Sequence, residues 1–311
     1  MVKKAGQRLR LLVQIAVAAV SNGYISGFLN GTIYQGSLKN FCVPGLNCYS
    51  CPGAFGSCPI GALQAVIGSP GKQISFYVIG FLLMVGALAG RFVCGWLCPF
   101  GLIQELIYKI PGLRKRKSLP GHRILKYLKY LILAVLVIAL PLIFTDLAGQ
   151  GSPWFCKLLC PAGTLEGGWT LTLFDPRLRG ALGWLFTWKS FLLLLLLFLS
   201  LVSYRPFCKY LCPLGAVYGL FNPISCLRLE VKKERCTDCG ACEADCPMSL
   251  DPAENPGSPE CIRCGKCLAA CEFGAISQTI LPGKRIFKKE KMGRIHSKQK
   301  KTNENGGKQH P

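Results

Sequence analysis

Residues 236–247 read CTDCGACEADCP, and residues 261–272 read CIRCGKCLAACE. Both stretches follow the pattern CxxCxxCxxxC, which supplies several thiolates from one tight turn. The glycine in each turn, Gly240 or Gly265, lets backbone N–H groups approach the inorganic sulfides of a cluster. The tandem pattern therefore predicts two 4Fe–4S clusters held by eight cysteines in this part of the chain.

The spacing also predicts which cysteines share a cluster. In two-cluster ferredoxins the fourth cysteine of each run ligates the other cluster. We expect one cluster on Cys236, Cys239, Cys242 and Cys271, and the second on Cys261, Cys264, Cys267 and Cys246. Pro247 follows the first run as usual, whereas Glu272 follows the second, which alters the turn and not the ligation. Paired CxxC groups also build zinc sites, but eight cysteines in this order fit two cubanes better.

The composition indicates a bilayer protein. Half of the 311 residues are hydrophobic, and they gather in long runs rather than in amphipathic stripes. A formal net charge of +22 is typical of nucleic-acid binders, but the Lys and Arg residues lie mainly at the edges of apolar runs and in the C-terminal tail. Most of the 19 cysteines fall in groups too closely spaced to bridge readily. We expect metal ligation rather than disulfides, and no nucleic-acid partner.

Four segments are apolar and long enough to cross a hydrocarbon core of about 30 Å, which takes ~20 helical residues. They are residues 9–29, 74–93, 124–144 and 182–204. The loop after the second segment carries six basic residues between Lys109 and Arg123, while the loops after the first and third carry only scattered ones. The positive-inside rule places this loop and both termini in the cytoplasm. Lys189, near the outer end of the fourth segment, can extend to the interface.

Both ends of the chain allow a second interpretation. Lys3, Lys4, Arg8 and Arg10 precede a short apolar run, as in a secretory signal peptide, whose cleavage would leave the later topology unchanged. We favour a retained helix because the apolar character continues to Leu29. The lysine-rich tail from Lys284 onward has few apolar residues and ends in polar ones, so it lacks the apolar material to bury and we expect it to be disordered.

A second cysteine pattern repeats within the apolar part. It occurs as CPIGALQ at Cys58, CPFGLIQ at Cys98, CPAGTLE at Cys160 and CPLGAVY at Cys212. Three copies carry a partner four residues earlier, namely Cys94, Cys156 and Cys208, while the first copy has Cys48 and Cys51 instead. Proline after cysteine suits the first turn of a helix, whose free N–H groups can face an anionic cluster. Four copies on alternating sides indicate an internal repeat.

The topology sorts these cysteines into two groups. The inner group is Cys94, Cys98, Cys208 and Cys212, and the outer group is Cys48, Cys51, Cys58, Cys156 and Cys160. We hypothesise one further 4Fe–4S cluster at each membrane interface, with the inner one near the C-terminal pair. Disulfides are the alternative for the outer group, and the sequence does not select four ligands among its five cysteines. Cys42 and Cys226 stand outside every group and are expected to be structural or accessory.

Other residues limit the remaining chemistry. The chain has no CxxCH, and its only histidines are His122, His296 and His310, which argues against haem as the main cofactor. No Walker or dinucleotide-binding glycine pattern indicates a nucleotide site. Arg205 and Lys209 flank Cys208, where positive charge could favour a reduced cluster, but we interpret both as ordinary positive-inside residues.

With these motifs the chain resembles the NapH/NosR/CcoG-like membrane polyferredoxins. The matching elements are Cys94 to Pro99, Cys208 to Pro213 and the runs from Cys236 and Cys261, and the resemblance covers most of residues 74–280. It implies electron transfer between the quinol pool or a soluble donor and a reductase system, and NapH-type members are regarded as quinol dehydrogenase components. The outer cysteines depart from the simple NapH pattern. The large outer flavin domain of NosR-like proteins is lacking, so a flavin would come from an extracytoplasmic partner protein.

We expect an α-helical membrane protein with about four transmembrane helices at 1–222, a small α+β dicluster ferredoxin-like domain at 223–282 and a basic tail at 283–311. The expected location is the cytoplasmic membrane, with the lipid bilayer and redox proteins as partners. The expected function is one-electron relay through the C-terminal, inner and outer clusters, in either direction, with no catalytic residue assigned. The rivals are a quinol dehydrogenase subunit, for which the spans show no polar quinone pocket, and a non-redox assembly or maturation scaffold.

Overall fold

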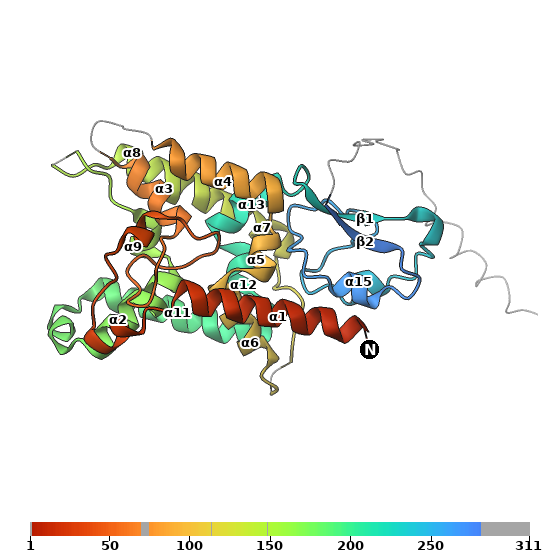
Figure 1. Ribbon diagram of the computed structural model, residues 1–311, viewed down its shortest axis with the longest axis horizontal. Coiled ribbons are helices and arrows are strands. Elements are labelled where there is room, and N and C mark those ends of the chain that lie inside the picture. Colours follow the sequence, from red (N-terminus) through yellow and green to blue (C-terminus); the bar gives the residue numbers. More distant parts are fainter. Residues whose placement is uncertain (1, 70–74, 113, 148, 281–311) are drawn as a thin grey trace, which may run out of the picture. The chain divides into compact units, whose positions relative to one another are not determined.

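The computed structural model describes residues 2–69, 75–112, 114–147 and 149–280. The predicted disordered tail from Lys284 onward lies outside these residues. Up to Phe221 the described chain is helical, with loops between its helices. The α-helices are α1 (Val2–Ser21), α2 (Ile25–Asn30), α3 (Pro59–Ile67), α4 (Phe76–Ala89), α5 (Phe92–Trp96), α6 (Pro99–Lys109), α7 (His122–Ile132), α8 (Leu140–Ile143), α9 (Trp154–Leu158), α10 (Thr170–Phe174), α11 (Trp184–Val202), α12 (Pro206–Tyr210) and α13 (Pro213–Phe221) (Figure 1).

The longer helices are joined by tighter or wider helical turns. Short 3-10 turns form η1 (Ser37–Asn40), η4 (Pro176–Ala181) and η5 (Lys233–Arg235). Two π-helical stretches are η2 (Leu133–Ala139) and η3 (Gly163–Trp169). Because η2 continues directly from α7 into α8, residues His122–Ile143 form one helix.

All four predicted apolar segments contain helix, but only two of the described helices are long and apolar enough to cross a membrane. These two are His122–Ile143 and α11, in the third and fourth segments. The first segment is not one helix, because α1 ends at Ser21 and α2 begins at Ile25. The second segment stops early. α4 has 14 residues and ends before Gly90, whose φ of 54° leaves the helical region, so at ~1.5 Å per residue it is shorter than a hydrocarbon core.

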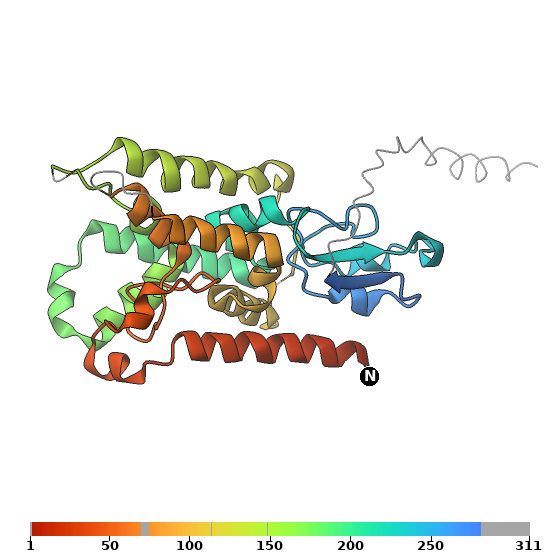
Figure 2. The same cartoon turned by 45° about the horizontal axis from the view of Figure 1, so that its top comes forward.

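Short helices that start at cysteine–proline pairs occupy the interior. Pro59, Pro99 and Pro213 stand in the first turns of α3, α6 and α13, with the preceding cysteine as the N-cap residue, which confirms the predicted role of these prolines. α13 contacts α4, α7 and α3, while α6 packs against α11 and α1. Figures 1 and 2 both show α1 running beside α6.

The last described segment is a small α+β unit. β1 (Leu227–Val231) pairs antiparallel with β2 (Ile276–Ile280), with Leu229 opposite Gln278. Between them lie α14 (Ala241–Ala244) and α15 (Lys266–Ala270), each starting after a glycine with positive φ. The turns repeat: Asp238 and Arg263, two residues before those glycines, have φ of 49° and 51°. The two cysteine runs therefore fold alike, and α15 lies against α1.

Candidate cluster sites

The inner cysteines lie together at the ends of α4 and α11. Each of these helices is followed by a short helix that carries one cysteine, Cys94 in α5 and Cys208 in α12. The next helices begin just after Cys98 and Cys212. All four residues are less than a tenth exposed. Burial raises the pKa of Cys212, and the thiols of Cys208, Cys94 and Cys98 raise it further, so the four thiols lie near one another.

Two buried arginines bind this group in a reciprocal arrangement. Arg91 precedes Cys94 by three residues, and Arg205 precedes Cys208 by three. Arg205 Nη1 donates to the Cys94 carbonyl at 2.5 Å, and Arg91 Nη2 donates to the Cys208 carbonyl at 2.9 Å. Both side chains are fully buried. Each inner CxxxC pair is thus tied to an arginine that comes from the other pair's segment.

Glycines make room for these guanidinium groups. A Cβ at Gly101 would lie 3.0 Å from Arg205 Nη1, and a Cβ at Gly215 would lie 3.3 Å from Arg91 Nη2. Both contacts are tighter than most side chains show, so the glycine of the CPxG pattern suits the close approach.

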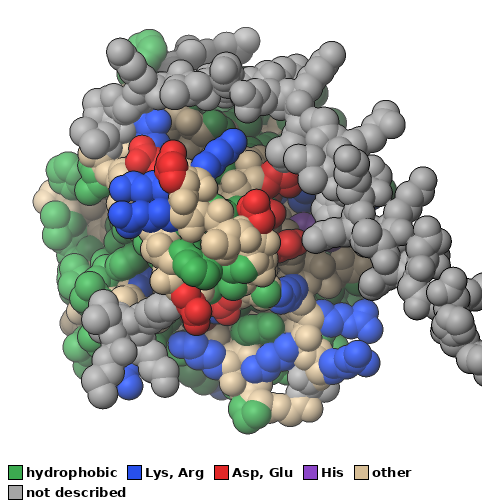
Figure 3. Space-filling view, turned by 90° about the vertical axis from the view of Figure 1, so that its right-hand side faces the viewer, with side chains coloured by type: hydrophobic (Ala, Val, Ile, Leu, Met, Phe, Trp, Pro, Cys, Tyr) green, Lys and Arg blue, Asp and Glu red, His purple; other side chains and the backbone are tan. Residues whose placement is uncertain are grey.

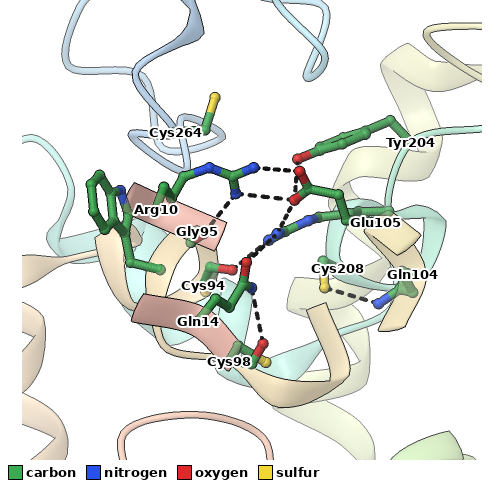
Figure 4. Close-up of polar contacts among 12 residues, drawn as sticks. Arg10, Gln14, Cys94, Gly95, Cys98, Gln104, Glu105, Tyr204, Cys208 and Cys264 are labelled. Atoms are coloured by element: carbon green, nitrogen blue, oxygen red, sulfur yellow. Dashed lines mark hydrogen bonds and ion pairs between the residues drawn. The ribbon is translucent and has the colours of Figure 1, made fainter. Parts of the chain in front are cut away.

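Two buried carboxylates balance part of the positive charge. Glu105 accepts from Arg205 at 2.6 Å and from the Tyr204 hydroxyl at 3.0 Å, and it also pairs with Arg10 (Figure 4). Glu260 pairs with Arg91 at 2.8 Å and with Lys129. Burial alone would raise the pKa of Glu105, but Arg205 and Arg10 lower it to about 2. Glu105 is therefore ionised at neutral pH, and its contribution to stability would be lost only as the pH falls from about 4.5 towards 2.

The interpretation of Arg205 and Lys209 as ordinary positive-inside residues is wrong. Arg205 is fully buried, and Lys209 is 1% exposed. Lys209 donates to the Lys117 carbonyl at 2.9 Å and to the Ser249 hydroxyl at 3.3 Å. Positive-inside residues are solvated, whereas these cations serve the packing around Cys208. The repeated spacing RxxCxxxCP was the sequence signal that could have identified Arg91 and Arg205.

Four of the five outer cysteines converge. Burial raises the pKa of Cys160 well above its usual range, and the thiols of Cys156, Cys48 and Cys58 raise it further. These four residues line one cavity of about 770 Å³. Cys51 is turned aside, because its thiol donates to Asn22 Oδ1 at 3.6 Å. The structure thus separates one cysteine from the five that the sequence left equivalent.

This separation predicts different outcomes for two neighbouring substitutions. Cys48→Ser is expected to remove the outer cluster and about four irons per chain, whereas Cys51→Ser is expected to keep the full iron content. Iron and acid-labile sulfide assays on the anaerobically purified variants measure this directly. Loss of iron from Cys51→Ser with retention in Cys48→Ser would overturn the assignment.

The surroundings of both groups fit thiolate-bound cubanes. Backbone N–H groups at helix starts point at sulfur: Gly163 N donates to Cys160 Sγ and Gly215 N to Cys212 Sγ, both at 3.4 Å. Gly61 lines this wall of the outer site, where a Cβ would lie 3.9 Å from Cys156 Sγ. All 19 cysteines are described and none forms a disulfide. No three His, Cys, Asp or Glu side chains among the described residues meet closely enough for a single metal ion.

The outer cavity also holds an unsatisfied polar group. Asn47 is fully buried, lines the cavity, and neither its amide nitrogen nor its oxygen has a hydrogen-bond partner among the described residues. Buried amides without partners are rare, so the cavity is shaped for a bound group. Lys39, which is also buried there, donates to the Ala54 carbonyl at 2.8 Å.

The eight C-terminal cysteines fall into a more buried set and a more exposed set, which we call the buried and the exposed C-terminal set. Cys246, Cys261, Cys264 and Cys267 line a single small pocket, which brings together the predicted second ligand set. Burial, together with the nearby thiols of Cys264 and Cys246, raises the pKa of Cys261 to about 11. In the other predicted set, Cys242 and Cys271 pack beside Leu229 and Ile276, Cys236 is partly exposed and Cys239 is exposed.

The buried C-terminal set touches the inner group. Trp96 Nε1 donates to the Arg263 carbonyl at 3.1 Å, and Gly95 packs directly on the Ile262 carbonyl. From α1, Gln7 donates to the Cys264 carbonyl at 3.0 Å. The loop Cys261–Cys264 is therefore fixed against the helix that carries Cys94.

The inner and outer groups are also linked. The loop before Cys48 reaches the inner group, since a Cβ at Gly45 would lie 3.0 Å from Cys98 Cα. Buried Tyr218 donates to the Pro44 carbonyl at 3.0 Å. Burial raises the pKa of Tyr218, and thiols of both groups raise it further: Cys94 and Cys98 of the inner group and Cys58 of the outer group. One aromatic side chain thus lies between the two groups.

Comparison with known proteins agrees with these groups. A family model described as a 4Fe–4S binding domain matches residues 74–118 and 184–230, and each matched segment contains one inner CxxxCP pair. The methylamine utilization ferredoxin-type protein MauN of Paracoccus denitrificans is 30% identical over 264 residues, which cover 81% of this chain and 80% of that protein. The chain belongs to the NapH-like polyferredoxins.

Other relatives extend the similarity of this NapH-like chain. The ferredoxin-type protein NapH of Escherichia coli is 27% identical over 227 residues, 68% of this chain and 67% of that protein. An uncharacterized protein of Methanocaldococcus jannaschii is 32% identical over 234 residues, 72% of this chain and 87% of that protein. No solved structure matches the chain. The relatives' names support an iron–sulfur protein of electron transport.

Proposed function

We propose that this NapH-like protein relays single electrons through four 4Fe–4S clusters between a cytoplasmic or quinol donor and a redox partner. The observation that carries the proposal is the series of contacts from the buried C-terminal set to the inner group and from the inner group to the outer one. Cys242 and Cys271 of the other C-terminal set pack on the same hydrophobic cluster as Cys267 of the buried set. Each cluster supplies a one-electron couple when bound. The eight C-terminal cysteines, the four inner cysteines and Cys48, Cys58, Cys156 and Cys160 are the proposed ligands.

The protein's own residues give the proposed clusters an insulated path. The inner cysteines are buried among α5, α6, α12 and α13, which exclude water. Arg91 and Arg205 direct positive charge at the inner group, and positive charge favours the reduced state of a cluster. Cys239, exposed at the other end of the series, is the proposed point of contact with a soluble redox protein.

Location in the cytoplasmic membrane is the second part of the proposal. Large apolar side chains point outward along the helices: Phe76 of α4 is 79% exposed and Phe198 of α11 is 57% exposed, as expected for lipid-facing residues. The basic residues Arg114–Lys117 are exposed. Charged side chains of both signs gather on the face that carries β1, β2 and α15 (Figure 3). This distribution favours cytoplasmic termini, with helices at 1–222 and the ferredoxin-like domain at 223–282.

Vesicles test the relay. With ferricyanide trapped inside and dithionite outside, we expect the ferricyanide absorbance to fall faster in vesicles that contain the protein than in protein-free vesicles. In vesicles that contain the double variant Cys98→Ser, Cys212→Ser, ferricyanide should be reduced at the protein-free rate, because this variant lacks the inner site. Equal rates of ferricyanide reduction for the variant and the unaltered protein would contradict the proposed path.

One observation favours a second function, that of a quinol dehydrogenase subunit. The outer cavity of about 770 Å³ falls within the range of organic ligand sites, ~300–1,000 Å³, and Lys189, Thr172 and Gln150 line it beside the cysteines. A quinol ring beside the outer group could then be the donor. Reduction of the purified protein's clusters by a soluble quinol, with no partner protein added, would support this function.

A further inference from the structure

Two glutamines occupy the same place in two copies of the internal repeat. Gln64 ends CPIGALQ and Gln104 ends CPFGLIQ. Gln64 Nε2 donates to Cys156 Sγ at 3.3 Å, and Gln104 Nε2 donates to Cys208 Sγ at 3.2 Å. Each glutamine therefore reaches the first cysteine of the CxxxC pair that completes its site. Gln64 is fully buried and Gln104 is 1% exposed.

A second contact fixes the orientation of both amides. Phe155 N donates to Gln64 Oε1 at 3.0 Å, and Phe207 N donates to Gln104 Oε1 at 3.1 Å. A backbone N–H can only donate, so the amide oxygen must face it. The NH₂ group is then left facing the sulfur of the next residue, Cys156 or Cys208. The direction of the N–H···S contact follows from the geometry and not from a choice between two amide rotations.

The other two copies of the repeat differ at this position. Glu166 ends CPAGTLE and accepts from Cys48 N at 2.7 Å, while Tyr218 ends CPLGAVY and donates to the Pro44 carbonyl. Both side chains contact backbone atoms rather than sulfur. Each site thus receives one side-chain amide donor to sulfur, Gln64 at the outer site and Gln104 at the inner site.

We propose that Gln64 and Gln104 are equivalent redox-tuning residues, each raising the reduction potential of its own cluster through an N–H···S bond. The inference rests on the proposed function, since it requires clusters at both sites. A reduced cluster carries one more negative charge than an oxidised one. A donor aimed at a ligand sulfur stabilises that extra charge, more strongly where water is excluded.

Two variants at each position separate tuning from packing. Gln104→Met keeps the side chain's length and removes the hydrogen bonds of the amide to Cys208 Sγ, to Phe207 N and to the Phe100 carbonyl. Gln104→Glu keeps an oxygen that accepts from Phe207 N, and it replaces the NH₂ group that donates to Cys208 Sγ with a second, acceptor oxygen. Redox titration followed by EPR is expected to show a lower inner-cluster potential in both variants, lowest in the Glu variant, with unchanged iron content. The matched variants Gln64→Met and Gln64→Glu should shift the outer cluster alone.

The signals are assigned by comparison with proteins that lack one site. The inner-cluster signal is the one absent from Cys98→Ser, Cys212→Ser, and the outer-cluster signal is the one absent from Cys58→Ser, Cys160→Ser. Unchanged potentials in all four glutamine variants would overturn the tuning role, as would loss of iron from both variants at one position. If the unaltered protein holds only about eight irons, the proposed function fails instead, and this result is distinct from either of those.

Discussion

Replacing Cys98 and Cys212 together by serine is expected to lower the iron content from about sixteen to about twelve per chain, with an equal loss of acid-labile sulfide. The two residues come from different halves of the chain, yet their thiols lie in one buried group. Serine hydroxyls are poor ligands for iron at neutral pH, so two lost thiolates leave no stable cubane. The spectrum should lose one cluster and keep the C-terminal signals.

The matched control is Cys42→Ser together with Cys226→Ser. These cysteines stand outside every group, and the Cys42 thiol lies 3.8 Å from the Ser57 hydroxyl. Iron should stay near sixteen per chain in this control. A count near eight in the unaltered protein, unchanged by either pair of substitutions, would show that only the C-terminal clusters exist.

Glu105→Gln is expected to destabilise the protein by about 3–5 kcal/mol, the usual effect of removing one partner from a buried ion pair. Glu105 is 2% exposed and is the carboxylate that Arg10 and Arg205 share. Glutamine has nearly the same shape as glutamate, so the loss of stability is caused by the missing charge and not by a change in volume. The melting temperature measured in detergent should fall by roughly 6 °C or more.

Exposed Glu254 supplies the control, because Glu254→Gln should change stability by no more than about 0.5 kcal/mol. A double variant, Glu105→Gln with Arg10→Gln, should recover part of the loss, since one unpaired cation is removed as well. If the Glu105→Gln and Glu254→Gln variants have the same melting temperature, the ion pairs of Glu105 contribute nothing to stability.

The short-range patterns were readable from the sequence, whereas the pairing between distant segments was not. Cysteine spacing predicted two C-terminal ligand sets and an inner group, because a cluster draws its ligands from tight turns, and the structure brings one C-terminal set and the inner cysteines together. The glutamines that end two repeat copies carried no signal of their targets, which lie 92 and 104 residues away in Cys156 and Cys208. Which sulfur a glutamine contacts depends on how the two halves of the chain pack, and no local sequence pattern encodes that packing.

Helix lengths were overestimated for a related reason. Apolar residues stand on both sides of Gly90 and of residues 22–24, so hydropathy joined segments that the backbone divides. Among the outer cysteines, Cys51 lies in the same short loop as Cys48 and differs only in the direction of its side chain. Hydropathy and spacing do not report direction, which depends on Asn22 in a distant segment.

The excess of buried cations bears on how the protein is made. Around the inner group two buried carboxylates, Glu105 and Glu260, form ion pairs with four buried cations, Arg10, Arg91, Arg205 and Lys129. Uncompensated charge in a dry interior is costly, and a thiolate-bound cubane is an anion of the right place and sign. With the proposed inner cubane as that anion, delivery of iron and sulfide would be a step of folding itself. Cells starved of iron should degrade the newly made chain rather than accumulate an empty form.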